Sequence, residues 1–96
     1  MITNYQTSDF TLIEGKYYSP SFKINKIDDL VTIEVRLNEQ GTINIQSSID
    51  GLIWYTVPST SFICNINGLQ SYKECHPELY YRIESSHLVN LAKILI

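Results

Sequence analysis

Residues 43–55 read INIQSSIDGLIWY, and this stretch predicts a β-hairpin. Ile43 and Ile45 alternate with polar residues, which is the period of a strand that buries one face. Asp50 and Gly51 follow, and this pair tolerates the positive φ angles of a type I′ turn, whose twist matches that of two antiparallel strands. We therefore expect a tight hairpin turn at Asp50-Gly51, with a second strand leaving it.

Strand patterns continue on both sides of this hairpin. Residues 30–38 give the clearest one, because apolar and polar residues alternate along its whole length. Gly41 and Asn67-Gly68 are expected to form further hairpin turns with glycine at positive φ. The apolar end Ile94-Leu95-Ile96 should pair inside a sheet, because an exposed apolar strand invites aggregation. The expected strands are 7–13, 17–24, 30–38, 42–48, 52–57, 59–66, 79–84 and 90–96, with a turn at 25–29.

The composition favours an all-β fold. The 96 residues include seven Tyr, many Ile and Thr, and a single Ala at position 92. β-Branched and aromatic side chains suit pleated surfaces, whereas Ala is the best helix former. We expect one domain over 1–96, an antiparallel, jelly-roll-like β-sandwich of seven or eight short strands, with a small barrel as the second choice. Helix content should be close to nil, and polar residues 1–8 should form a loose N-terminal arm.

Charge and hydropathy exclude two classes of partner. The net charge is −3 and the seven Lys and Arg residues form no cluster, so no nucleic-acid partner is expected. No apolar run approaches the roughly 20 residues of a membrane span, so no membrane partner is expected either. The first residues lack the basic and apolar regions of a signal peptide, which predicts synthesis in a host cytoplasm without signal-directed secretion. Cys64 and Cys75 are then expected to be reduced thiols, although a disulfide between them is open.

No pattern predicts catalysis, a metal or a cofactor. Cys64, Cys75, His76 and His87 lack the close pairs of ligands that structural zinc sites use. Adjacent residues Cys75 and His76 would point to opposite faces of a strand, so they form neither a chelate nor a thiolate–imidazolium pair there. The serines flank turns and strand ends, and the acidic residues occupy turns or wet faces. We expect a protein that is not an enzyme.

Three aromatic doublets are the most informative side chains, namely Tyr17-Tyr18, Trp54-Tyr55 and Tyr80-Tyr81. Neighbouring residues on a strand face opposite ways, so each doublet should place one ring inside and one outside. The phase of the strands predicts that Tyr81 and Tyr55 lie inside and that Tyr80 and Trp54 lie outside. Exposed rings beside an Arg are typical of interfaces, although plain packing is the alternative. The interface candidates are Phe10, Tyr18, Trp54, Tyr72, Tyr80 and Arg82.

Several short segments, in this order, carry a family resemblance. They are FKI at 22–24, the alternating strand at 31–37, GTINIQ at 41–46, SIDGLIW at 48–54, YYRI at 80–83 and a closing apolar strand. The chain resembles the small β-sandwich modules of virion proteins from tailed phages and large DNA viruses. Such modules occur in capsid decoration, auxiliary capsid, fibre and baseplate proteins.

The resemblance implies a function based on contacts. It implies a non-enzymatic structural virion protein, an auxiliary or decoration protein that stabilises the shell by binding capsid subunits, located in the virion. The alternative is a carbohydrate-binding or host-adhesion module of a fibre or baseplate, because exposed Trp and Tyr rings also stack on sugars. A cellular interaction domain is a third reading. A glycan and further copies of the chain are additional partners that these readings allow.

Overall fold

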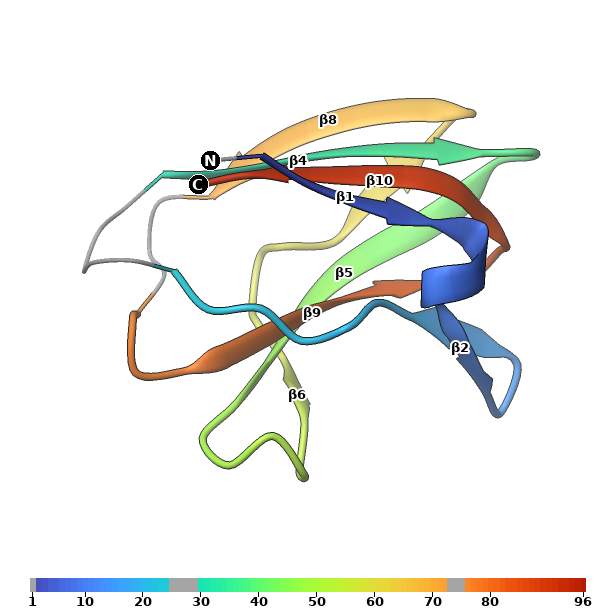
Figure 1. Ribbon diagram of the computed structural model, residues 1–96. Helices are drawn as coiled ribbons and strands as arrows, with labels where there is room; N and C mark the ends of the chain where they lie inside the picture. Colours follow the sequence, from blue (N-terminus) through green and yellow to red (C-terminus); the bar gives the residue numbers. More distant parts are fainter. Residues whose placement is uncertain (1, 25–29, 73–75) are drawn as a thin grey trace.

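The chain folds into two antiparallel sheets that face each other (Figure 1). The computed structural model describes residues 2–24, 30–72 and 76–96. The first sheet, called the β4 sheet below, has the order β1-β10-β4-β8; the second, called the β9 sheet, has the order β2-β3-β9-β5-β6, with β7 paired to β5. The predicted antiparallel β-sandwich is therefore confirmed, and the barrel is not formed.

The described residues contain ten strands, more than the seven or eight expected. They are β1 (Ile2–Gln6), β2 (Thr11–Ile13), β3 (Lys16–Tyr18), β4 (Val31–Leu37), β5 (Gly41–Ser48), β6 (Tyr55–Thr56), β7 (Phe62–Cys64), β8 (Asn67–Tyr72), β9 (Tyr80–Ser85) and β10 (Val89–Leu95), with the 3-10 turn η1 (Thr7–Asp9). No α-helix occurs in this part of the chain, and no helix there is long and apolar enough to cross a membrane. The turn expected at 25–29 and Cys75 lie outside the described residues.

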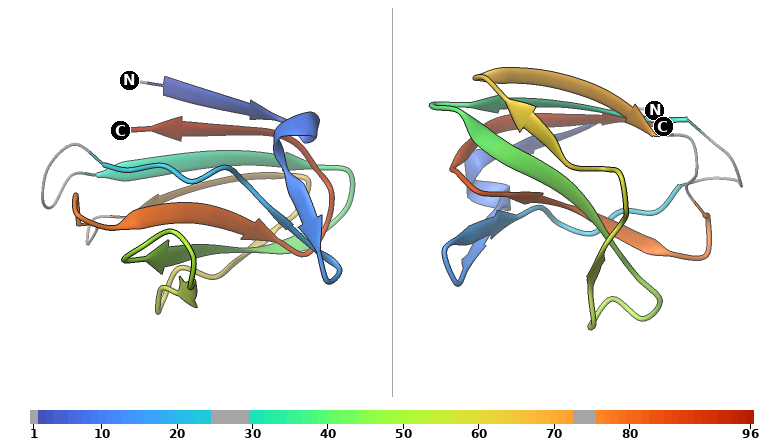
Figure 2. Two further views of the ribbon diagram at one scale, coloured as in Figure 1. Left: turned by 60° about the horizontal axis from the view of Figure 1, so that its bottom comes forward. Right: turned by 180° about the vertical axis from the view of Figure 1, so that it is seen from behind.

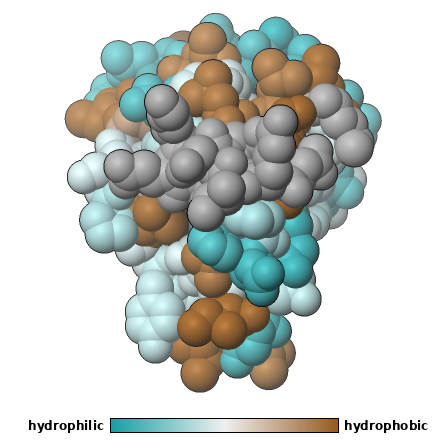
Figure 3. Space-filling model, turned by 90° about the vertical axis from the view of Figure 1, so that its left-hand side faces the viewer, coloured by the Kyte–Doolittle hydropathy of each residue, from teal (hydrophilic) through white to brown (hydrophobic). Residues whose placement is uncertain are grey.

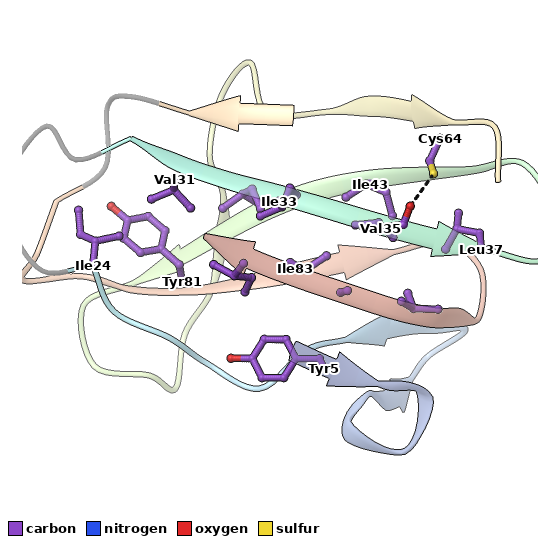
Figure 4. Packing of buried hydrophobic residues seen from close by; sticks show 14 residues of the cluster. Tyr5, Ile24, Val31, Ile33, Val35, Leu37, Ile43, Cys64, Tyr81 and Ile83 are labelled. Atoms are coloured by element: carbon purple, nitrogen blue, oxygen red, sulfur yellow. Dashed lines mark hydrogen bonds between the residues drawn. The ribbon is translucent and has the colours of Figure 1, made fainter. Parts of the chain in front are cut away.

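Fourteen buried hydrophobic side chains fill the space between the sheets (Figure 4). The strand β4 shows the expected alternation, because Val31, Ile33, Val35 and Leu37 are each at most 2% exposed. Burial of apolar surface of this kind contributes about 25 cal/mol per Å² to folding. The alternating patterns read from the sequence therefore define the inner faces of the sandwich.

Both ends of the chain lie in the β4 sheet. Strand β10 pairs with β1 on one side and with β4 on the other, and Ile94 is 1% exposed. The expected pairing of the apolar C-terminal strand is confirmed. The expected loose arm at 1–8 is wrong from Ile2 onward, because β1 supplies the buried Tyr5 to the core. The ring of Phe10 meets that of Tyr5 edge to face, with centroids 6.4 Å apart.

The polar residues that suggested a loose arm instead make hydrogen bonds, one local and one to the start of β10. The backbone N–H of Gln6 donates to Asp9 Oδ2 at 2.8 Å, and the Thr7 hydroxyl donates to the carbonyl of Val89 at 2.8 Å. The predicted strand at 7–13 is therefore divided into η1 and the short β2. The polar side chains of Thr7 and Asp9 make hydrogen bonds to backbone groups at this bend, so their presence in the sequence does not indicate disorder.

The turn after β5 differs from the predicted type I′ turn. That type needs positive φ at both central residues, but only Gly51 has it, at +79°, while Asp50 does not. Residues 49–54 form a wide loop between β5 and β6. The Ser48 hydroxyl accepts the N–H of Gly51 at 2.8 Å, and Asp50 Oδ1 accepts those of Leu52 at 2.9 Å and Ile53 at 3.2 Å. Side-chain oxygens therefore close this turn in place of a tight backbone conformation.

The prediction of positive φ at Gly41 and Gly68 is wrong. Neither Gly41 nor Gly68 has positive φ. A Cβ at Gly41 would lie 2.9 Å from His87 Nδ1, and one at Gly68 would lie 2.8 Å from Phe62 Cε2. Glycine is needed there for space, and Asn67-Gly68 begins β8 while Ile66 takes the positive φ of +81°.

Candidate binding surface on the outer face of the β9 sheet

Four of the six interface candidates gather on one surface. Tyr18 comes from β3, Tyr80 and Arg82 come from β9, and Trp54 comes from the loop between β5 and β6. Tyr80 and Arg82 are two residues apart on a strand and so share a face, while the buried Tyr81 between them points to the core. The predicted orientation of Tyr80 and Tyr81 is therefore confirmed.

The other two candidates lie apart from this surface. Phe10 packs against the core near Tyr5. Tyr72 lies on β8 in the β4 sheet, where its ring contacts the core and its hydroxyl donates to the carbonyl of Thr60 at 2.8 Å. Both rings serve packing, which is the alternative that the sequence left open for the aromatic residues.

Arg82 lies at the centre of the aromatic surface. Its guanidinium carbon is 4.0 Å from the centroid of the Tyr18 ring and 4.4 Å from that of the Trp54 ring. Its Nε donates to Gln46 Oε1 at 2.7 Å. Guanidinium groups favour such stacking, and each cation–π contact contributes about 0.5–1 kcal/mol or more. Burial lowers the pKa of Arg82, and the neighbouring Tyr18 and Glu84 oppose that shift.

A buried carboxylate fixes the floor of this surface. Glu84 is 5% exposed. Its Oε2 accepts the Tyr18 hydroxyl at 3.0 Å and Gln46 Nε2 at 3.1 Å, and its Oε1 accepts Asn44 Nδ2 at 3.0 Å. Lys16 Nζ lies 3.7 Å from Oε1. Burial, followed by the bond to Glu84, raises the pKa of Tyr18. The alternation in the sequence predicts a solvent-exposed position for Glu84, and it gives no sign of this hydrogen-bond network.

The strand register brings these side chains together. Tyr18 and Asn44 both lie opposite Glu84, and Gln46 lies opposite Arg82. Cross-strand partners on one face stand about 5 Å apart. Three strands that are distant in the sequence therefore place one carboxylate, one guanidinium and their amide partners in a connected polar network.

The loop between β5 and β6 adds an apolar tip to this side of the molecule. Ile49 is 83% exposed, Leu52 is 82% exposed and Ile53 is 61% exposed. Tyr55 is 69% exposed, so its expected inward position is wrong, and Trp54 is half-buried against Arg82. Tyr55 lies opposite Ser47, in the phase of the buried Ile43 and Ile45, but the hairpin extends beyond the core and leaves the ring in solvent. Figure 1 shows the hairpin projecting from the sandwich, and Figure 3 shows apolar atoms gathered at the lower end of the molecule.

A chain of polar contacts that the sequence did not suggest joins two turns. Ser86 Oγ lies 2.8 Å from His87 Nδ1, and His87 Nε2 lies 3.5 Å from Glu39 Oε1. The same Ser86 oxygen accepts the backbone N–H of Thr42 at 2.8 Å. The backbone N–H of Ser86 also donates to the carbonyl of Thr42 at 3.1 Å, so these contacts join the turn after β9 to the start of β5.

The remaining cysteine and metal candidates also have structural surroundings. Cys64 is fully buried and unbonded to another cysteine; its thiol donates to the carbonyl of Val35 at 3.7 Å. Burial raises the pKa of this thiol, which disfavours the reactive thiolate. Within the described ranges, no three His, Cys, Asp or Glu residues gather as metal ligands would.

Comparisons with known proteins bear on the fold alone. No protein-family model and no curated protein matches the chain. Among solved structures, the crystal structure of PirA matches with a TM-score of 0.55 and 11% sequence identity, over 97% of this chain and 90% of that chain. At this identity the match describes a shared β-sandwich architecture.

Proposed function

We propose that the chain is a non-enzymatic structural virion protein, an auxiliary or decoration protein that stabilises a capsid by binding its subunits. The observation that carries this proposal is the apolar tip formed by Ile49, Leu52, Ile53 and Tyr55, each more than 60% exposed. Contiguous exposed apolar groups of this kind are typical of protein interaction sites. The resemblance of the segments at 41–54 and 80–83 to virion sandwich modules supports a capsid as the partner.

The tip and the outer face of the β9 sheet meet at the loop between β5 and β6. Trp54 belongs to the same loop as the tip and contacts Arg82, so this loop connects the tip to the outer face. An interface of this composition has an apolar centre with Trp, Tyr and Arg beside it.

Purified particles test this proposal directly. The chain should co-purify with intact particles at a copy number that matches the capsid lattice. Leu52→Asp should lower this occupancy, because it places a charge in the buried centre of the interface. Leu12→Asp is the matched control, since Leu12 is 58% exposed on the edge strand β2, away from the tip. A wild-type chain that stays free in the lysate and is absent from particles would refute the proposal.

The outer face also favours a second candidate, a carbohydrate-binding or host-adhesion module. Tyr18, Trp54 and Tyr80 present aromatic rings beside the polar groups of the network, and ring faces of this kind stack on sugars. Binding to a glycan array that disappears in Trp54→Ala, without any particle association, would place this candidate above the first.

A further inference from the structure

Arg82 retains two terminal nitrogens, with four N–H donors, that the fold does not use. Its Nε is bonded to Gln46. In the part of the chain that the structure describes, neither terminal nitrogen has a hydrogen-bond acceptor, and no carboxylate lies within 4.0 Å of them. These nitrogens are not among the buried polar atoms without a partner, so they reach solvent. The guanidinium therefore offers its outer edge to a ligand.

This outer edge is held in a fixed orientation. The bond to Gln46 and the contacts with the Tyr18 and Trp54 rings restrain the guanidinium plane. Gln46 is itself held by Glu84, to which it donates at 3.1 Å. A pre-oriented planar fork binds a carboxylate through two parallel hydrogen bonds and loses little side-chain entropy in doing so.

Two of the acidic side chains at this surface are already bonded, and a third, Glu14, lies close enough to Tyr18 to raise its pKa. Glu84 accepts hydrogen bonds from three side chains, and Asp50 accepts the N–H groups of Leu52 and Ile53. Two further cations lie at the same surface, with Lys16 Nζ 3.7 Å from Glu84 Oε1 and Lys23 Nζ 4.5 Å from the Tyr80 ring centroid. Glu84 and Asp50 are engaged by these partners, so neither supplies an acceptor to the terminal nitrogens of Arg82, whose printed hydrogen bond is made by Nε.

We propose that Arg82 is the anchor for a carboxylate side chain, Asp or Glu, of the protein partner that covers the apolar tip. This inference rests on the proposed function, and it names the charged group of the partner. A protein is favoured over an acidic sugar because the fork adjoins exposed aliphatic side chains, Ile53 among them, through Trp54. Arg, Trp and Tyr are also the residues most enriched at the energetic centres of protein interfaces.

An NMR titration of the wild-type chain with N-acetylglutamate amide tests, without the partner, whether the terminal nitrogens of Arg82 bind a carboxylate. The Arg82 Nε–Hε and Trp54 indole signals should shift saturably, while N-acetylglutamine amide, which has the same shape without the charge, should leave them unchanged. Arg82→Lys should weaken binding of the charged probe about fivefold or more, because Lys cannot bind it bidentately. Arg36→Lys is the control, since it makes the same exchange on the β4 sheet.

Two results of this titration would overturn the inference. One is equal response of the Arg82 signal to the charged and neutral probes. The other is tighter binding of glucuronate than of N-acetylglutamate amide, which would assign the fork to an acidic sugar. On particles, Arg82→Lys should lower occupancy and Arg36→Lys should not; equal occupancy of both variants and wild type would also overturn it. Failure of the proposed function differs from these results, because the wild-type chain itself would then be absent from particles.

Discussion

Each sheet carries a glutamate on its outer face, and the two differ in what surrounds them. Glu84 in the β9 sheet is 5% exposed and accepts hydrogen bonds from Tyr18, Asn44 and Gln46. The side chain of Glu34 in the β4 sheet is 37% exposed, with one ion pair, to Arg36 at 3.6 Å. Its Oε1 is buried without a hydrogen-bond partner. Both residues follow the same alternation, yet only Glu84 belongs to a network.

This difference in hydrogen bonding indicates which of the two outer faces holds its side chains in one arrangement. An ion pair between side chains as exposed as those of Arg36 and Glu34, at 53% and 37%, contributes little, about 0–1 kcal/mol. The Glu84 network instead fixes Tyr18 and Gln46, and through them Arg82. A connected and buried polar network restricts side chains to one arrangement, which suits a surface that must present donors in a defined orientation.

The largest expected effect concerns the core that both faces share. Ile94→Asp should lower the free energy of unfolding by about 3–5 kcal/mol, because it buries an unpaired charge between β1 and β4. Lys93→Gln, at the next position and on the outer side, should change it by less than about 0.5 kcal/mol. Thermal melting followed by circular dichroism measures both. An unchanged melting temperature in Ile94→Asp would show that β10 is not paired as described.

The second prediction compares the loss of stability when each of the two glutamates is replaced by glutamine. Glu84→Gln should cost about 2–3 kcal/mol, because an amide NH₂ replaces an acceptor and faces donors from its neighbours. Glu34→Gln should cost less than about 0.5 kcal/mol, since it removes one exposed ion pair. Urea unfolding of the two variants gives the comparison. Equal losses would mean that the outer faces do not differ in organisation.

The third effect concerns the loop that joins the apolar tip to the β9 sheet. Gly51→Val should cost about 1–2 kcal/mol, because a β-branched residue resists the φ of +79°. Crowding adds little, since a Cβ there would meet only Tyr80 Cδ2, at 3.9 Å. Gly51→Asn should cost less than half as much, because Asn tolerates this region. If urea unfolding finds both variants equal to wild type, the positive φ at Gly51 is not required.

The smallest effect is a pH dependence of the same loop. Bonds from the N–H groups of Leu52 and Ile53 and from the Ser48 hydroxyl lower the pKa of Asp50. A pKa lowered in the folded state gives a stabilisation that is present above the unfolded pKa and disappears as the pH falls through the folded pKa. NMR titration should find the Asp50 carboxyl below its ordinary value of 3.8. In Asp50→Asn the Leu52 and Ile53 amide signals should no longer follow this titration.

Much of the fold could be predicted from the sequence. Alternation placed β4, β5, β9 and β10 close to their observed bounds, because period-2 patterning reflects burial of one face. Turn geometry could not be predicted in the same way. The side chains of Ser48 and Asp50 accept backbone N–H groups and widen the turn, and Gly68 is needed because Phe62 lies over it. Both facts depend on contacts that a local pattern does not encode.

The candidate site was predictable only in part. An aromatic doublet on a strand identifies one outward ring, which located Tyr80 and Trp54 on an outer face. The partners of such rings depend on register between strands that are far apart in the sequence, as with Tyr18 opposite Glu84. Glu84 therefore looked like an ordinary wet position, and the contact between Arg82 and Trp54 could not be foreseen.

Ile2 pairs with Leu95 in the neighbouring antiparallel strands β1 and β10, so the chain enters and leaves the sandwich at one place. Figure 2 shows β1 beside β10, and Figure 1 shows the β5–β6 hairpin at the bottom of the molecule, below the β4 sheet. Cα atoms of such pairs lie about 5 Å apart, so a surface loop of another protein need open by little more than that to accept the whole sandwich as a graft. The carrier would then be joined to the β4 sheet, while the hairpin belongs to the β9 sheet.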